Sequence, residues 1–207
     1  MIKAKGPVWH KKHKQQNIIP KGLRGIDKEA TWCTSKADGW IYGHGSFSIV
    51  SHKIPVLGCF LWMPNSGHEA KRMYSEMNHY QDCLKYIVMD SKADDQKLLS
   101  VLKDNYKMNL VTVCRKHMNK TESRRAMIKR MQSPRRRKYL KERSHTVEPM
   151  QGIVKDIFEL ERCWMRGDEN NRWLFAAMGI AVQMAQLKAV KEQKSTWKIK
   201  AEVLGEP

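Results

Sequence analysis

The chain has 207 residues, 41% of them hydrophobic, which is enough for one domain with a sizeable core or for one domain with an arm. Its formal net charge of +18 favours a polyanionic partner. The longest apolar run, Trp173 to Val182, is too short to span a bilayer, and the first residues lack the apolar core of a signal peptide. We therefore expect a cytoplasmic, nucleoid-associated protein with no membrane contact.

The five cysteines indicate a reducing compartment, because none of them forms a C-x-x-C pair. They are Cys33, Cys59, Cys83, Cys114 and Cys163. Cys114 and His117 have a spacing that zinc could use, but no second pair accompanies them. We expect free thiols and no zinc site.

The first elements are predicted from breakers and from alternation. Residues 1–22 are basic and poor in apolar side chains, and we interpret them as an arm or as the remnant of a preceding domain. Leu23 to Asp27 is a short strand candidate. Trp40 to Val50 alternates apolar and polar residues late in its run, which predicts a strand. The apolar run from Pro55 to Met63 predicts a strand that is buried on both faces.

Helices and strands alternate in the middle of the chain. We expect a helix from about His68 to Cys83 and then an apolar strand, Lys85 to Met89, that ends at Asp90. Asp94 and Asp95 favour the N-terminus of the next helix. Another strand follows at Leu110 to Cys114.

A basic segment then separates this region from the last helices. Arg115 to Arg143 holds 13 Lys or Arg and two acids, a net charge of +11 and more than half of the excess of the chain. That density is too high for a solvated face alone. An amphipathic helix reaching Leu160 contains Glu148, and a last helix, Trp173 to Val190, is apolar around most of its circumference and is expected to be buried.

Three strands in series, followed by alternating strands and helices, predict an α/β fold with a mixed sheet flanked by helices. This is the element order of the ribonuclease H-like fold, with a basic insertion before the helix of Glu148 and an extra C-terminal helix. The fold is expected to occupy residues 23–190, between the arm at 1–22 and a polar tail at 191–207.

Two carboxylates come at predicted strand ends, and a third comes near the start of a helix. Asp27 and Asp90 would emerge at one sheet edge if their strands are neighbours, and Glu148 could reach that edge. Converging carboxylates repel one another unless cations lie between them, and hard oxygen ligands suit two Mg²⁺ or Mn²⁺ ions. The alternative is structural, because Asp90 could simply cap the turn before the next helix.

The segment from Tyr139 to Lys155 reads Y-L-K-E-R-S-H-T-V-E-P-M-Q-G-I-V-K. It resembles the third-acid region of the DDE transposases of bacterial insertion sequences, and the resemblance covers roughly residues 22–187. It implies that Asp27, Asp90 and Glu148 are catalytic acids that bind two metal ions. It also implies DNA contacts by Tyr139, Arg143 and Lys155, although the gaps that follow Tyr139 and Arg143 are each one residue longer than in the commonest form.

Several alternatives stay open beside this resemblance. Asp38 competes with Asp27 as the first acid, and Asp94 and Asp95 compete with Asp90 as the second. The run Arg135, Arg136, Arg137 and Lys138 is expected to hold DNA phosphates, and the resemblance implies a dimer on transposon-end and target DNA. A truncated or decayed transposase that binds DNA without catalysis is the alternative function. A nuclease of the ribonuclease H or resolvase type is a third hypothesis for the function.

Overall fold

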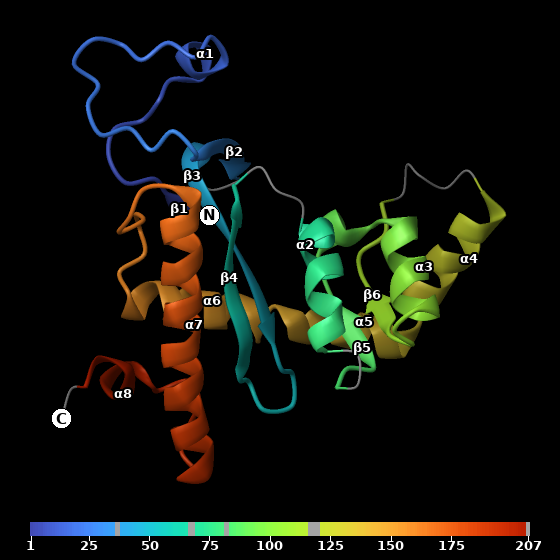
Figure 1. Ribbon diagram of the computed structural model, residues 1–207. Coiled ribbons are helices and arrows are strands. Elements are labelled where there is room, and N and C mark those ends of the chain that lie inside the picture. Colours follow the sequence, from blue (N-terminus) through green and yellow to red (C-terminus); the bar gives the residue numbers. More distant parts are fainter. Residues whose placement is uncertain (36–37, 66–68, 81–82, 116–120, 206–207) are drawn as a thin grey trace. The chain divides into compact units, whose positions relative to one another are not determined.

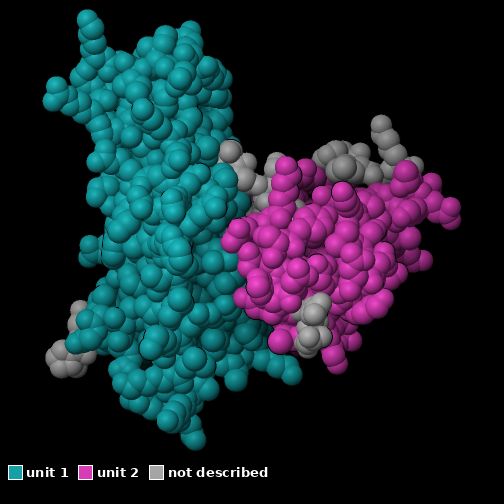
Figure 2. Space-filling view, in the orientation of Figure 1, with its two compact units in different colours: residues 1–67, 149–207 teal, residues 68–148 magenta. Residues whose placement is uncertain are grey.

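The computed structural model describes residues 1–35, 38–65, 69–80, 83–115 and 121–205 (Figure 1). The protein is a mixed α/β chain with an open sheet, as the sequence predicts at this coarse level. It folds into two compact units, coloured separately in Figure 2. Unit 1 comprises Met1–Gly67 and Pro149–Pro207, and unit 2 comprises His68–Glu148.

A long central strand organises the sheet of unit 1. Strand β3 (Gly39–Val50) pairs antiparallel with β1 (Ile2–Lys3), β2 (Thr31–Ser35) and β4 (Leu57–Pro64). The close approach of β1 requires a glycine at Gly43, because a Cβ there would overlap the carbonyl oxygen of Ile2. The expected strands at 40–50 and 55–63 are confirmed within one or two residues of their observed bounds.

Helices complete the core of unit 1. They are α1 (Lys11–Gln15), α6 (Val147–Ile157, whose first two residues belong to unit 2), α7 (Asp168–Lys191) and α8 (Lys200–Leu204). In Figure 1, α7 runs beside β4. Phe175 of α7 stacks on Phe60 of β4 with ring centroids 5.4 Å apart. Gly179 lets the helix approach, because a Cβ there would lie 3.2 Å from the backbone nitrogen of Phe60.

Unit 2 is built around a two-stranded parallel sheet of β5 (Tyr86–Val88) and β6 (Asn109–Val111). Its helices are α2 (Glu69–Glu76), η1 (Met77–His79), η2 (Ser91–Ala93), α3 (Gln96–Asp104), α4 (Glu122–Met131) and α5 (Pro134–Arg143). The Asp95 carboxylate caps α3 by accepting hydrogen bonds from the N–H groups of Lys97 and Leu98, which confirms the predicted helix start. The expected helix at 68–83 is shorter, and positions 68, 81 and 82 lie outside the described residues.

Two expectations about elements are wrong. Leu23 to Asp27 contains a turn instead of a strand, because Gly22 and Gly25 have φ angles of 87° and 75°, which interrupt an extended run. The last helix is buried on one face only, since Trp173 and Met184 of α7 are 75% and 66% exposed. The N-terminal residues also join the fold, with Ile2 in the sheet and buried.

Candidate nucleic-acid interface

Two consecutive basic helices of unit 2, α4 and α5, form the candidate interface. Both have regular starts: the Thr121 hydroxyl accepts a hydrogen bond from the N–H of Arg124, and Pro134 occupies the first turn of α5. From Glu122 to Arg143 the chain carries ten Lys or Arg and two acids. The exposed basic residues are Arg125, Lys129, Arg130, Arg135, Arg137, Lys138 and Lys141. Such a density of exposed cations suits a phosphate backbone.

One arginine of α4 has a structural role that the sequence did not reveal. The Arg124 guanidinium is buried and donates to the buried carboxylate of Asp94, which also accepts the N–H of Arg115 at 2.6 Å. This hydrogen bond to Asp94 raises the pKa of Arg124 against the opposing effect of burial. Asp94, an alternative second acid, is thus engaged in an ion pair.

The predicted DNA contacts Arg135 and Tyr139 lie together on α5. The Arg135 guanidinium lies 5.1 Å from the ring centroid of Tyr86 and 5.9 Å from that of Tyr139, and its Nε donates to the Tyr139 hydroxyl at 3.2 Å. The two tyrosine rings are 5.3 Å apart. The aromatic rings therefore limit the positions that the Arg135 head can take.

The rest of the predicted basic run divides in two. Arg136 is half-buried, and its Nη1 donates to the carbonyl of Arg130 at 3.2 Å, so it ties α5 to the end of α4. Arg137 and Lys138 are exposed, and Lys138 lies 3.8 Å from Glu142. Of this run, Arg135, Arg137 and Lys138 are therefore accessible to a phosphate.

The predicted third acid lies where the basic helices end. Only residues 144–146 separate α5 from α6, and Arg143 Nη1 donates to Glu148 Oε1 at 3.4 Å. The Glu148 side chain is 62% exposed, so its carboxylate is open to a ligand. Lys155 is half-buried and lies two turns further along α6, about 10 Å from Glu148 along the helix axis.

The predicted second acid occupies a cap. Asp90 follows β5, and its Oδ1 accepts the N–H of Lys92 at 2.8 Å at the start of η2. The hydroxyl of Thr112, just after β6, donates to the Asp90 carbonyl. The capping alternative is thus observed, and the half-exposed carboxylate keeps a second oxygen for which no hydrogen bond is seen in the described structure.

The predicted first acid is enclosed in unit 1. Asp27 is 1% exposed, and its Oδ2 accepts hydrogen bonds from His44 Nε2 at 2.9 Å and from the N–H of Gly167 at 3.2 Å. Its Oδ1 accepts the N–H of Glu29 at 3.2 Å. Both oxygens of this carboxylate therefore already have donors.

The partner on the far side of His44 fixes its tautomer. Trp62 Nε1 lies 3.0 Å from His44 Nδ1, and an indole N–H can only donate. Nδ1 must therefore accept, and Nε2 carries the proton that is donated to Asp27. This buried row of Trp62, His44 and Asp27 was missed in the sequence, where the only signal is a histidine on the alternating strand at 40–50.

Charge around this row is balanced by hydrogen bonds. Burial by itself raises the pKa of Asp27, but the hydrogen bond from His44, with those from the N–H groups of Gly167 and Glu29, outweighs it and leaves the pKa below its ordinary value. Burial raises the pKa of the neighbouring Asp168. Burial also lowers the pKa of Lys14, although Asp27 and Asp168 partly oppose this.

The acids differ in how well they fit a divalent cation. Asp90 and Glu148 present carboxylate oxygens of the kind that Mg²⁺ or Mn²⁺ prefers. Asp27 does not fit in its present arrangement, because a metal would have to displace its hydrogen-bond donors. Within the residues that the structure describes, no three His, Cys, Asp or Glu side chains are grouped to hold a metal ion. Asp27 belongs to unit 1, whereas Asp90 and Glu148 belong to unit 2.

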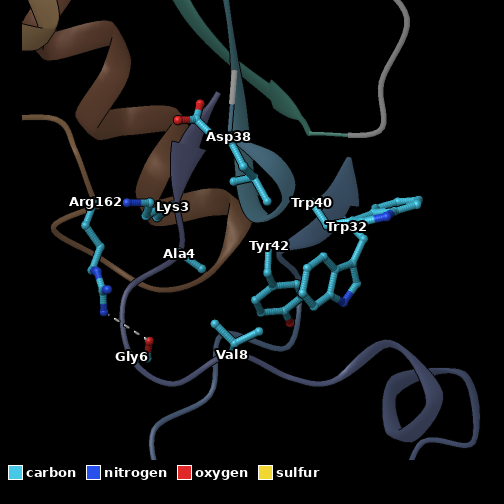
Figure 3. Close-up of a pocket in the computed structure, with 10 residues that line it drawn as sticks. Lys3, Ala4, Gly6, Val8, Trp32, Asp38, Trp40, Tyr42 and Arg162 are labelled. Carbon is cyan, nitrogen blue, oxygen red and sulfur yellow. Dashed lines mark hydrogen bonds between the residues drawn. The ribbon is translucent and has the colours of Figure 1, made fainter. Parts of the chain in front are cut away.

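A cavity of about 370 Å³ lies in unit 1, beside the hairpin of β2 and β3 (Figure 3). Trp32 and Tyr42 are directly opposite in the strand register, and their ring centroids are 5.3 Å apart. Lys3 and Arg162 also line the cavity, and Arg162 donates to the Gly6 carbonyl at 3.4 Å. The carboxylate of Asp38 lines the same cavity, so aromatic rings and charges of both signs meet there.

Helix α7 is long and apolar enough, by length and composition alone, to cross a membrane. Core helices of soluble proteins meet the same criteria, and α7 packs on β4. Comparisons with protein-family models, with characterised proteins and with solved structures found no match to this chain.

Proposed function

We propose that this chain is a transposase that cleaves DNA and transfers DNA strands with the help of divalent metal ions. The observation that carries the proposal is the junction of α5 and α6. There a row of exposed cations is followed by the half-buried Arg143, and Arg143 contacts the exposed carboxylate of Glu148. A carboxylate beside phosphate-binding cations is a pairing that metal-dependent phosphodiester chemistry can use.

The order of elements supports a ribonuclease H-like fold as the finer form of the α/β architecture. Strands β2, β3 and β4 form an antiparallel series, and β5 and β6 follow as a parallel pair. We propose that this fold occupies residues 23–190 and that the two basic helices are its insertion before α6. We propose that the protein is located in the cytoplasm, in association with the nucleoid and not with a membrane.

In this proposal Asp27, Asp90 and Glu148 would hold two Mg²⁺ or Mn²⁺ ions, which would supply charge stabilisation at the phosphodiester. The residues of the chain orient the DNA. Arg143 and Lys155 hold phosphates near Glu148, and Tyr139 positions one of them. Arg135, Arg136, Arg137 and Lys138 extend the phosphate contacts along α5.

The proposed chemistry has two displacements at phosphorus. Water attacks the phosphorus at the element end, the P–O3′ bond breaks, and a 3′-hydroxyl and a 5′-phosphate are left. The 3′-hydroxyl then attacks a phosphorus of the target DNA, bonds to it, and releases the 3′-hydroxyl of the cut target strand. Asp27 can take part only after it exchanges the donors of His44, Gly167 and Glu29. A dimer on DNA would bring two ends together.

Nicking of supercoiled plasmid tests the proposal. The wild type should convert plasmid to nicked circles in Mg²⁺ or Mn²⁺ but not in EDTA, and Asp90→Asn should abolish this conversion while it retains DNA binding. Asp104→Asn is the control, since Asp104 is an exposed acid at the end of α3. Nicking that survives in Asp90→Asn would show that the site is assigned wrongly.

DNA binding without catalysis is the second candidate function. The enclosure of Asp27 favours it, because a carboxylate with three donors is poorly available to a metal. This candidate predicts salt-sensitive binding to duplex DNA through α4 and α5 and no metal-dependent nicking. A ribonuclease H-type activity would instead cleave RNA–DNA hybrids in preference to duplex DNA.

A further inference from the structure

The outward face of α7 carries an apolar stripe that is absent from the core. Its members are Trp173, Ala177, Ile180, Met184 and Leu187, which recur at alternating intervals of four and three residues. All five are exposed, and the four large side chains are 75%, 56%, 66% and 63% exposed in chain order. The opposite face of the same helix is buried, with Phe175, Met178, Val182, Ala185 and Ala189 in the core of unit 1.

Intervals of four and three residues are the spacing of a coiled-coil seam. A core-facing helix uses a single stripe, whereas α7 has one stripe on the core and a second, separate stripe on the outside. A contiguous apolar patch of this kind marks an interaction surface. We propose that the stripe is the contact between two copies of this chain, which pair through α7 as an antiparallel two-helix seam.

The area of the stripe fits a second copy. A large apolar side chain covers about 200 Å², so the four large residues expose about 500 Å² on each copy. Two copies would bury about 1,000 Å² before flanking side chains are counted, which is the lower limit for a specific interface. An isologous contact needs no other chain, because the same stripe serves both partners.

The charges on α7 select the antiparallel direction. Asp168 and Glu169 lie in the first turn, and Lys191 lies in the last turn together with Lys188, which pairs with Glu202 of its own chain. An antiparallel pair sets the acidic end of one helix beside the basic end of the other and also aligns the helix dipoles favourably. A parallel pair would place like charges together at both ends.

Ala177, the small residue of the stripe, also suits an antiparallel pairing of the two helices. In the antiparallel register that sets Ala177 of one copy opposite Leu187 of the other, Ile180 lies opposite Met184. Ala177 then shares a layer with a large side chain. The proposal is independent of metal binding and of DNA cleavage, because unit 1 alone supplies the whole of α7.

Light scattering on the full chain without DNA tests the pairing. The wild type should have twice the 24.2 kDa mass of one chain, and Ile180→Glu should have the mass of one chain. Ile54→Glu is the matched control and should stay dimeric, because Ile54 is 54% exposed, close to the 56% of Ile180, but lies between β3 and β4. Circular dichroism should be unchanged in both variants.

A zero-length carboxyl–amine cross-linker tests the direction in a mixture of ¹⁵N-labelled and unlabelled chains. Glu169 and Lys191 are about 33 Å apart along one helix, so a cross-link between them must join two copies. Mixed-isotope Glu169–Lys191 peptides are expected, and their absence from a dimer would overturn the antiparallel arrangement. A monomeric wild type, or a dimer that persists in Ile180→Glu, would overturn the pairing. The pairing would likewise be wrong if the wild-type chain were a monomer that binds lipid vesicles, or a monomer in which the amides of the stripe are protected from hydrogen exchange.

Discussion

Asp27→Asn should destabilise unit 1, because the amide cannot accept all the hydrogen bonds that the carboxylate accepts. Two donors, His44 Nε2 and the N–H of Gly167, share Oδ2, and the N–H of Glu29 reaches Oδ1. If the oxygen of the substituted amide accepts from the first two donors, its NH₂ group faces the N–H of Glu29, and two donors cannot form a hydrogen bond. One lost bond and the lost charge on the others cost about 2–4 kcal/mol in total.

Urea unfolding followed by tryptophan fluorescence measures this cost in unit 1 selectively, because all seven tryptophans belong to unit 1. A loss of about 2–4 kcal/mol should lower the transition midpoint by about 1–2 M at unchanged slope. Asp38→Asn is the control, since Asp38 is an exposed acid of the same unit, and it should change the free energy of unfolding by less than about 0.5 kcal/mol. Equal midpoints for Asp27→Asn and the wild type would refute the hydrogen-bonded row.

The pH dependence of this difference follows from the lowered pKa of Asp27. A carboxyl group whose pKa is lower in the folded chain than its ordinary value of 3.8 contributes stability above that value. This contribution is lost as the pH falls through the folded pKa. The difference between the wild type and Asp27→Asn should therefore be constant near neutral pH and shrink below about pH 4.

Three further predictions test the packing and the charge of the fold. Gly179→Ala should destabilise unit 1 by about 1–3 kcal/mol, because the added Cβ overpacks against β4. Gly152→Ala should stabilise the same unit by about 0.5–1 kcal/mol, because a Cβ there meets nothing within 4 Å. Urea unfolding measures both changes. Arg124→Met leaves the buried carboxylate of Asp94 without its guanidinium and should lower the free energy of unfolding of unit 2 by about 3–5 kcal/mol. Hydrogen exchange of the amides in α3 and β6 measures this loss, and full retention of their protection would contradict the buried pair. Arg137→Ala should reduce the slope of log affinity for duplex DNA against log salt by about 1, whereas Lys103→Ala, an exposed cation of α3, should leave that slope unchanged.

Local patterns were sufficient for the elements whose signals lie within a few residues. Alternation predicted β3, and the cap of Asp95 predicted the start of α3, because both depend on neighbours in the chain. The strand expected at 23–27 failed because its apolar residues lie among two glycines in a left-handed conformation. The inclusion of Ile2 in the sheet was not predictable, since it depends on the contact with Gly43, 41 residues away.

The contacts of the candidate site also differ in whether they join near or distant residues of the chain. Arg143 and Glu148 are five residues apart, and the short link between two helices brings them together. Arg135 and Tyr139 are one helical turn apart, so their contact also follows from spacing. The enclosure of Asp27 depends instead on His44 from the sheet and on Gly167, which directly precedes α7, and no pattern within the sequence joins those positions.

The most direct test of the proposed function is metal-dependent nicking of plasmid by Glu148→Gln beside Glu122→Gln. Both acids are exposed, belong to unit 2 and lie in the first turn of a helix, so the two variants are matched in exposure, unit and place in the helix. Glu148→Gln should lose nicking while it keeps its duplex DNA affinity and its stability, and Glu122→Gln should nick as the wild type does. Equal nicking by the two variants, or no nicking by the wild type in Mg²⁺ or Mn²⁺, would contradict the proposal that Glu148 serves DNA cleavage.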